Sequence, residues 1–191
     1  MKIENLCFSY LDKEIEKTVF DGLNLISNSR IICLMGPSGC GKTTLLHILA
    51  GLLKPCGGTV SDFPENISIM FQEDRLLPWL NAYENVALVR SGNLSWKGQD
   101  DRAAQLLKAL DIDPAMGIGS MSGGMKRRVA LARALAFESE ALLLDEPFKG
   151  MDEDLVQRAA KLISSQGKIT VVSTHSEAEA KALGAEIVRL H

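Results

Sequence analysis

The stretch IICLMGPSGCGKTT, residues 31–44, decides the fold of this protein. Five apolar residues come first, which predicts a strand buried on both faces, and a helical pattern follows the glycines. Between them lies GxxxxGK[ST], in the strand-to-helix context that a phosphate-binding loop requires. Glycines let the backbone wrap closely around phosphate oxygens, and the first turn of the helix presents free N–H groups to the anion. We therefore expect an α/β protein with a phosphate site.

The residues of this loop have separate expected roles. The Lys42 ammonium should contact the β- and γ-phosphates of a nucleotide, and the Thr43 hydroxyl should hold Mg²⁺. A glycine-rich turn without a ligand is the alternative, which the strand and helix on either side argue against. The predicted nucleotide-binding residues of the loop are Gly36, Pro37, Ser38, Gly39, Cys40, Gly41, Lys42, Thr43 and Thr44.

A pair of carboxylates ends a second apolar run, ALLLDEP at residues 141–147. Successive side chains of a strand point to opposite faces, so Asp145 and Glu146 should face different ways. Asp145 is expected to reach the Mg²⁺ shell, and Glu146 to polarise a water aimed at the γ-phosphate. The two acids could instead begin a solvated loop, but the phosphate loop in the same chain makes that alternative less attractive.

Composition and charge place the chain among ordinary globular proteins. Its 191 residues are 46% apolar and 24% charged, enough to bury one core. The formal net charge of −3 gives no bulk reason to bind nucleic acid, although KRR at 126–128 could form a local basic patch. Four scattered cysteines indicate reduced thiols rather than a zinc site or disulfides. We expect neither a signal peptide nor a membrane span.

Apolar runs and helical patterns alternate along the chain. The expected strands lie near residue 3 and at 31–35, 67–71, 141–144, 169–173 and 186–190; the expected helices lie at 43–53, 103–110, 123–137, 155–164 and 177–183. This order predicts a mainly parallel central sheet covered by helices. Residues 74–137 carry helical patterns without a strand, so we expect an inserted helical subdomain, with a loop at 91–101.

The stretch MSGGMKRRVALARAL, residues 121–135, resembles the LSGGQ-type signature of ATP-binding cassette (ABC) ATPases. Met121 stands where Leu is usual, and Met125 where Gln is usual. Read by residue type alone, SGG before a helical pattern is an N-cap whose free N–H groups suit an anion. Its position between the phosphate loop and the acid pair favours the signature. The resemblance covers nearly the whole chain and implies ATP and Mg²⁺ as ligands.

The same resemblance implies further site residues. Tyr10 resembles the aromatic residue that stacks on adenine, and Gln72 the glutamine that contacts Mg²⁺ and the attacking water. Asp152 resembles the acid of the D-loop, although Lys149 departs from the small residue usual before it. His175 resembles the switch histidine that contacts the γ-phosphate. Taken one at a time, such residues more often pack or make local hydrogen bonds.

The family's arrangement implies a mechanism and a domain plan. Two copies bind head to tail, with ATP held between the Lys42 loop of one and Ser122, Gly123 and Gly124 of the other. Water attacks the γ-phosphate in line, with Glu146 as the base and His175, Gln72 and Lys42 as further catalytic residues. Residues 1–73 and 138–191 would form a RecA-like core with a small N-terminal antiparallel β part. Residues 74–137 would form the helical subdomain that carries the signature.

The stretch FQEDRLLPWLNAYENVAL, residues 71–88, resembles subunits of nitrate, sulfonate and taurine importers. We therefore expect the ATP-hydrolysing subunit of a bacterial importer for a small anion or organic solute, at the cytoplasmic face of the membrane. A membrane permease should dock near Gln72, Leu76 and Trp79, unless the leucines pack a local core, and an extracytoplasmic solute-binding protein should act indirectly. We expect no nucleic-acid partner.

Two other functions remain open at the sequence level. A soluble ABC ATPase of iron–sulfur cluster assembly is the alternative to the transport subunit, because it needs the same motifs. A nucleotide kinase or GTPase would also use the phosphate loop, but it would leave the SGG element and His175 unexplained.

Overall fold

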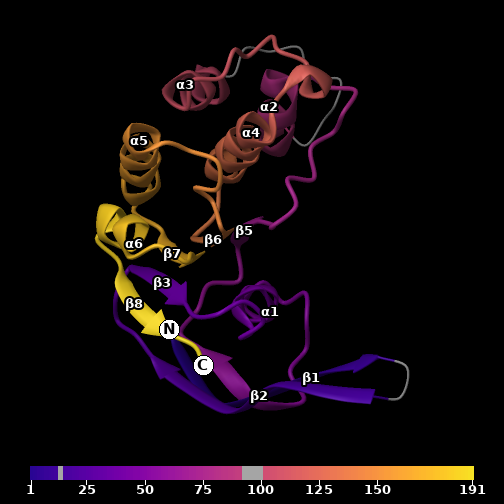
Figure 1. Ribbon diagram of the computed structural model, residues 1–191, viewed down its shortest axis with the longest axis vertical. Coiled ribbons are helices and arrows are strands. Elements are labelled where there is room, and N and C mark those ends of the chain that lie inside the picture. The colour runs from indigo at the N-terminus through magenta and orange to yellow at the C-terminus, as the bar shows by residue number, and fades with distance from the viewer. Residues whose placement is uncertain (13–14, 92–100) are drawn as a thin grey trace.

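The computed structural model describes residues 1–12, 15–91 and 101–191, so the loop expected at 91–101 lies almost wholly outside the described residues. Two sheets form within this part of the chain (Figure 1). The larger is parallel, in the order β5 (Ile67–Met70), β6 (Ala141–Asp145), β7 (Ile169–Ser173), β3 (Ile31–Met35) and β8 (Glu186–Arg189). The smaller is antiparallel, with β1 (Lys2–Asp12) between β2 (Ile15–Ile26) and β4 (Gly57–Ser61).

Both faces of the parallel sheet are buried, and nearly every residue of its central strands β3, β6 and β7 is inaccessible to solvent. Leu142 and Leu144 of β6 pack into one hydrophobic cluster, whereas Leu143 packs into a second. The first cluster includes residues of α2 (Ala82–Ser91), α3 (Asp101–Ala109), α4 (Gly123–Ala136), α5 (Glu153–Ser164) and α6 (Glu177–Leu183). The second joins α1 (Lys42–Leu49) to the antiparallel sheet. The sheet thus holds the two halves of the molecule together.

Three helices gather at the end of the molecule that lies away from the antiparallel sheet (Figure 1). They are α2, α3 and α4, and all fall within residues 74–137; the short 3-10 helix η1 (Ile118–Ser120) lies between α3 and α4 in the chain. The division of the chain into a core and a helical subdomain stays a prediction. In the described part of the chain, none of the helices has the length and apolar character needed to cross a membrane.

Some elements differ from the expected ones. The first helix ends at Leu49 rather than at residue 53, because Gly51 takes a φ of 70° and the N–H of Leu52 turns back to His47 O. Strands β2 and β4 and helix α2 were not among the expected elements. The sequence of β4, GGTVS, is short and largely exposed, so it lacks the apolar pattern that marks a buried strand.

The carboxyl ends of the parallel strands meet at one edge of the sheet, which positions the candidate site. The phosphate loop follows β3, Gln72 follows β5, Asp145 ends β6 with Glu146 directly after it, and His175 follows β7. These residues are far apart in the sequence, but all of them lie at the same edge of the parallel sheet.

Candidate active site

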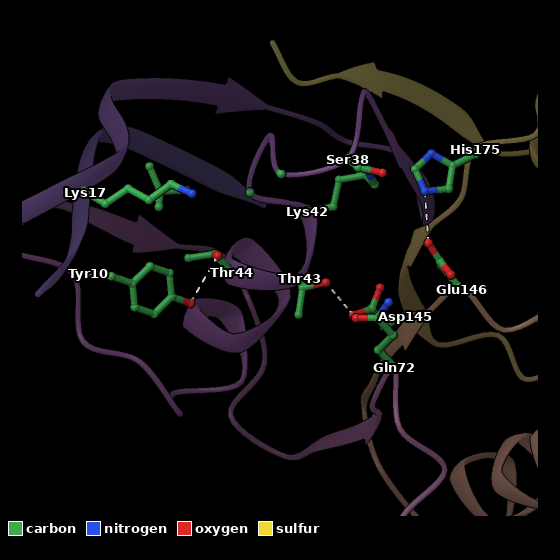
Figure 2. A pocket seen from close by; sticks show the side chains of 13 residues that line it. Tyr10, Lys17, Ser38, Lys42, Thr43, Thr44, Gln72, Asp145, Glu146 and His175 are labelled. Carbon is green, nitrogen blue, oxygen red and sulfur yellow. Dashed lines mark hydrogen bonds and ion pairs between the residues drawn. The ribbon is translucent and has the colours of Figure 1, made fainter. Parts of the chain in front are cut away.

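A cavity of about 280 Å³ opens at this edge of the sheet (Figure 2). It brings together the phosphate loop, both acids of β6, and residues from the ends of β5 and β7. The hairpin of β1 and β2 closes its far end. The lining residues are Tyr10, Lys17, Val19, Ser38, Gly39, Gly41, Lys42, Thr43, Thr44, Gln72, Asp145, Glu146 and His175.

The phosphate loop closes tightly onto the antiparallel sheet. Gly41 has a φ of 97°, and a Cβ there would lie 2.7 Å from atoms of Val19 and Phe20, so glycine is required. The Lys42 ammonium donates hydrogen bonds to Gly36 O at 2.8 Å and Pro37 O at 3.0 Å. The loop's own carbonyls thus hold this buried cation beside the cavity, where it can meet phosphate oxygens.

Two oxygen-bearing side chains meet between the loop and β6. Thr43 Oγ1 donates to Asp145 Oδ2 at 2.7 Å, and Ser173 Oγ donates to Asp145 Oδ1. A hydroxyl and a carboxylate are the oxygen ligands that Mg²⁺ prefers, with the remainder supplied by water and substrate phosphates. The described residues contain no group of three or more His, Cys, Asp or Glu that could hold a metal. These two side chains therefore fit a magnesium ion that is shared with a phosphate ligand, and not a metal site made of protein alone.

Glu146 is held in an unusual backbone conformation at the end of β6. Its φ is 48°, in the left-handed region that is uncommon for a residue of this type. Its N–H donates to Ser173 O at 3.1 Å and Ser173 Oγ at 3.0 Å, which fixes the turn. The carboxylate then faces the cavity, where Oε1 lies 2.9 Å from His175 Nε2 (Figure 2). The acid and the histidine predicted from the sequence are thus in contact.

An aromatic ring stands at the other end of the cavity. Tyr10 is 40% exposed, its hydroxyl lies 3.2 Å from Thr44 Oγ1, and Phe8 packs edge-on with its ring centroid 4.9 Å away. One face of the ring can therefore receive a planar base. Sequence reasoning missed Lys17 and Val19, which line the cavity from β2. Lys17 is the cross-strand partner of Tyr10, so recognising the hairpin would have identified it.

Several predicted residues lie outside the cavity lining. Gly36, Pro37 and Cys40 belong to the loop but do not line the cavity of the described residues. Ser122 is the N-cap of α4, where its Oγ accepts from Met125 N at 3.2 Å. Asp152 is the N-cap of α5, where it accepts from Leu155 N at 2.9 Å. The chain does not bring its own signature residues, Ser122, Gly123 and Gly124, to its own phosphate loop.

The start of α4 contacts the loop that follows Asp145 and Glu146. A Cβ at Gly124 would lie 2.8 Å from Gly150 O, and Gly150 itself has a φ of 78°. Only glycines allow this approach of two backbones. Lys149, the residue that departs from the family pattern, is exposed beside this contact.

Comparison with known proteins gives one consistent family. The sequence model of the ABC transporter domain matches residues 22–149. The taurine import ATP-binding protein of Pseudomonas aeruginosa is 36% identical over 97% of this chain and 76% of its own length. The aliphatic sulfonates import ATP-binding protein of Corynebacterium glutamicum is 38% identical over 91% of this chain and 74% of its own. The bicarbonate transport ATP-binding protein of Synechococcus elongatus is 35% identical over 98% of this chain and 74% of its own length.

Solved structures give the same answer for the fold. A dimeric ATP-binding cassette, MJ0796, in a post-hydrolysis state with ADP and Pi, superposes with a TM-score of 0.82 and 28% sequence identity. The match covers 99% of this chain and 93% of the other. A second dimeric structure of the same protein, described as a bacterial ABC transporter cassette, gives a TM-score of 0.83. These matches confirm the predicted fold class.

Proposed function

The chain belongs to the ABC transporter family, and from this premise we propose that it binds and hydrolyses ATP to power a bacterial importer. The observation that carries the proposal is the convergence of Lys42, Thr43, Asp145, Glu146 and His175 on one cavity. A cation, a hydroxyl, two acids and a histidine from three separate segments suit phosphoryl transfer to water. The comparisons offer no support for the iron–sulfur assembly alternative.

The transported solute is proposed to be a small anion or a small organic solute. Support comes from the relatives, which are named as ATP-binding proteins of taurine import, aliphatic sulfonates import and bicarbonate transport. The cavity in this chain is lined by a phosphate loop and a tyrosine, so it suits a nucleotide and leaves selection of the solute to other subunits.

Different residues around the cavity would bind different parts of ATP. Lys42 and the N–H groups at the start of α1 balance the phosphate charge, and Tyr10 stacks on the adenine. Thr43 and Asp145, with Gln72, would hold Mg²⁺. When bound, Mg²⁺ supplies positive charge to the phosphate oxygens and orients them for in-line attack. Val19 adds an apolar side chain to the cavity lining.

Glu146 and His175 act on the attacking water. Glu146 accepts the water proton as a bond forms between the water oxygen and the γ-phosphorus, while the bond to the β–γ bridging oxygen breaks and the electron pair leaves with ADP. His175 keeps the carboxylate oriented through the 2.9 Å contact and can turn its Nε2 to the γ-phosphate. Lys42 stabilises the charge that develops on the phosphoryl group.

A second copy is proposed to complete each site. Ser122 and Gly123 are exposed at the N-terminus of α4, with N–H groups suited to an anion, yet they do not line this chain's cavity. A head-to-tail pair of identical chains would place the signature of one, with Asp152, against the phosphate loop of the other.

A membrane permease is the proposed partner at residues 72–79. Trp79 is 72% exposed, Leu76 is half-buried against the helical cluster, and Gln72 reaches the cavity from the same segment. An exposed aromatic beside apolar neighbours suits a docked helix. Through the permease, the chain would lie at the cytoplasmic face of the membrane and respond indirectly to an extracytoplasmic solute-binding protein.

Replacing the proposed base tests the function. Glu146→Gln should retain ATP binding and lose hydrolysis by roughly 10² to 10⁴-fold, because the amide cannot accept the water proton. The measurement is phosphate release, with ATP affinity titrated in parallel. Glu65→Gln, an exposed acid outside the cavity, is the matched control and should behave like the wild type. Equal turnover of Glu146→Gln and wild type would contradict the proposal.

A further inference from the structure

Arg127 is the buried member of the basic run at 126–128. The sequence left open a surface patch there, but this side chain is 4% exposed and points inward from α4. Its guanidinium makes five hydrogen bonds to described residues. The acceptors are the carbonyls of Phe71, Gln72, Asp145 and Glu146 and the carboxylate of Asp74.

All three nitrogen atoms of the guanidinium donate hydrogen bonds. Nη1 donates to Phe71 O at 2.8 Å and to Gln72 O at 3.0 Å, and Nε donates to Glu146 O at 3.1 Å. Nη2 donates to Asp145 O. A planar group with donors in fixed directions can join two neighbouring strand ends, which a single ammonium cannot do.

Asp74 offsets the cost of burying this charge. Its Oδ1 accepts from Nη1 at 2.9 Å, and its side chain is 24% exposed. A buried cation with one carboxylate and four carbonyls has partners for its donors, so the charge is tolerated in the interior.

Three of the four carbonyls held by Arg127 belong to residues whose side chains line the proposed catalytic cavity. Gln72, Asp145 and Glu146 all do so, and Glu146 has the left-handed backbone described above. Arg127 itself does not line the cavity, so its action on the reaction is indirect. It lies on the helix that begins with the signature, and it therefore connects that helix to two catalytic segments.

We propose that Arg127 is a positioning residue for ATP hydrolysis. It holds the backbones of Gln72 and Glu146 at fixed positions relative to α4. The side chains of both residues then aim correctly only when α4 is in place. The inference rests on the proposed function, because it assigns Arg127 to the same reaction. Misplacement of a catalytic group by about 1 Å can cost on the order of a hundredfold in rate.

Arg128 provides a matched control on the same helix. Its Nη1 also donates to two backbone carbonyls, Leu110 O at 2.7 Å and Asp111 O at 3.0 Å. Those acceptors lie at the end of α3, away from the cavity. Loss of Arg128 removes comparable hydrogen bonds without touching Gln72 or Glu146.

The test compares Arg127→Met, Arg127→Lys and Arg128→Met in the full chain. Arg127→Met should lower kcat by roughly tenfold to a hundredfold and leave the Kd for ATP within about twofold, because Lys42 and its loop are untouched. Arg127→Lys keeps the charge beside Asp74 but cannot span both strand ends, so its kcat should stay low. Arg128→Met should retain the wild-type kcat.

Amide hydrogen exchange gives a readout that does not depend on turnover. Arg127→Met should speed exchange at residues 71–74 and 145–147, whereas Arg128→Met should not. Unchanged exchange in Arg127→Met would overturn the inference even if the wild type hydrolysed ATP slowly. So would a wild-type kcat in Arg127→Met, full rescue by Arg127→Lys, or a parallel loss of ATP affinity. Equal turnover of wild type and Glu146→Gln would instead count against the proposed function alone.

Discussion

Cys33 shows how the interior changes the chemistry of one side chain. The chain has four cysteines, and Cys33 is the one that is fully buried, in the middle of β3. Burial, with a smaller contribution from the charge of Glu179, raises the pKa of this thiol from 9.0 to about 12. The thiolate is disfavoured in the core, so Cys33 should be inert to alkylation while exposed Cys56 reacts.

The raised pKa predicts a loss of stability in alkali. The folded chain keeps the Cys33 proton up to about pH 12, whereas the unfolded chain releases it near pH 9.0. The contribution to stability is therefore complete below pH 9.0 and disappears as the pH rises toward 12. Urea unfolding from about pH 8 to about pH 11 should show a steeper fall in the free energy of unfolding for wild type than for Cys33→Ala. Cys56→Ala should keep the wild-type slope, and identical slopes for all three proteins would contradict this prediction.

At the same scale, the sequence predicted site residues from the groups that a nucleotide and Mg²⁺ require, and their roles stay predictions. Lys42, Thr43 and Asp145 were predicted because phosphate and Mg²⁺ need those groups at that spacing, and all three line the cavity. Lys17 was not predicted because the strand that pairs it with Tyr10 was not recognised, and Arg127 because residue type does not tell which way a side chain points. The fold turns Lys17 into the cavity and Arg127 into the core.

At the scale of elements, uniform burial made strands easy to recognise. Strands β3, β6 and β7 are mostly apolar because both of their faces are covered, and the sequence predicted each of them within a residue. Strand β2 was missed, because it carries charged residues and Gly22 with a φ of 74°. The backbone hydrogen bonds to β1 hold this segment as a strand, although its own sequence lacks a strand pattern.

The contribution of one helix cap to stability can be measured at the start of α5. Asp152 Oδ1 accepts from Leu155 N at 2.9 Å, so Asp152→Ala should lower the free energy of unfolding by about 1 kcal/mol through loss of the cap. Asp152→Asn should keep most of this stability, because Asn caps equally well. Urea unfolding measures both variants. If Asp152→Asn were as unstable as Asp152→Ala, the negative charge, and not the cap, would be the stabilising feature.

At the scale of the whole molecule, the proposed site is shared between two chains. Lys42 lines the cavity, whereas Gly123 is exposed at the start of α4 and does not line the cavity of the described chain. A Cβ at Gly123 would meet nothing within 4 Å, so a side chain there fits without disturbing its own fold. Substitution at Gly123 should therefore affect the partner's site only.

Two inactive variants should complement each other when they are mixed. Lys42→Ala loses its own phosphate site, and Gly123→Asp places a negative charge where the partner's γ-phosphate should lie. In a mixed head-to-tail pair, one of the two sites keeps both wild-type halves. Random pairing should restore roughly a quarter of wild-type phosphate release, if the two sites act independently.

The control for this mixture is a double variant that carries both substitutions. It can form no intact site with either single variant, so it should restore nothing. Absence of recovery in the Lys42→Ala and Gly123→Asp mixture, with both proteins folded and paired, would contradict the shared site.

The sequence by itself determined the family, the phosphate loop, the acid pair and the buried strands, because each depends on a local pattern of residue types that chemistry or burial imposes. The tertiary structure alone decided that Glu146 meets His175, that Lys17 faces Tyr10 across a hairpin, and that Arg127 joins α4 to two strand ends. The reason is physical. These contacts join segments distant in the chain, and their geometry exists only after the parallel strands align their carboxyl ends at one edge of the sheet.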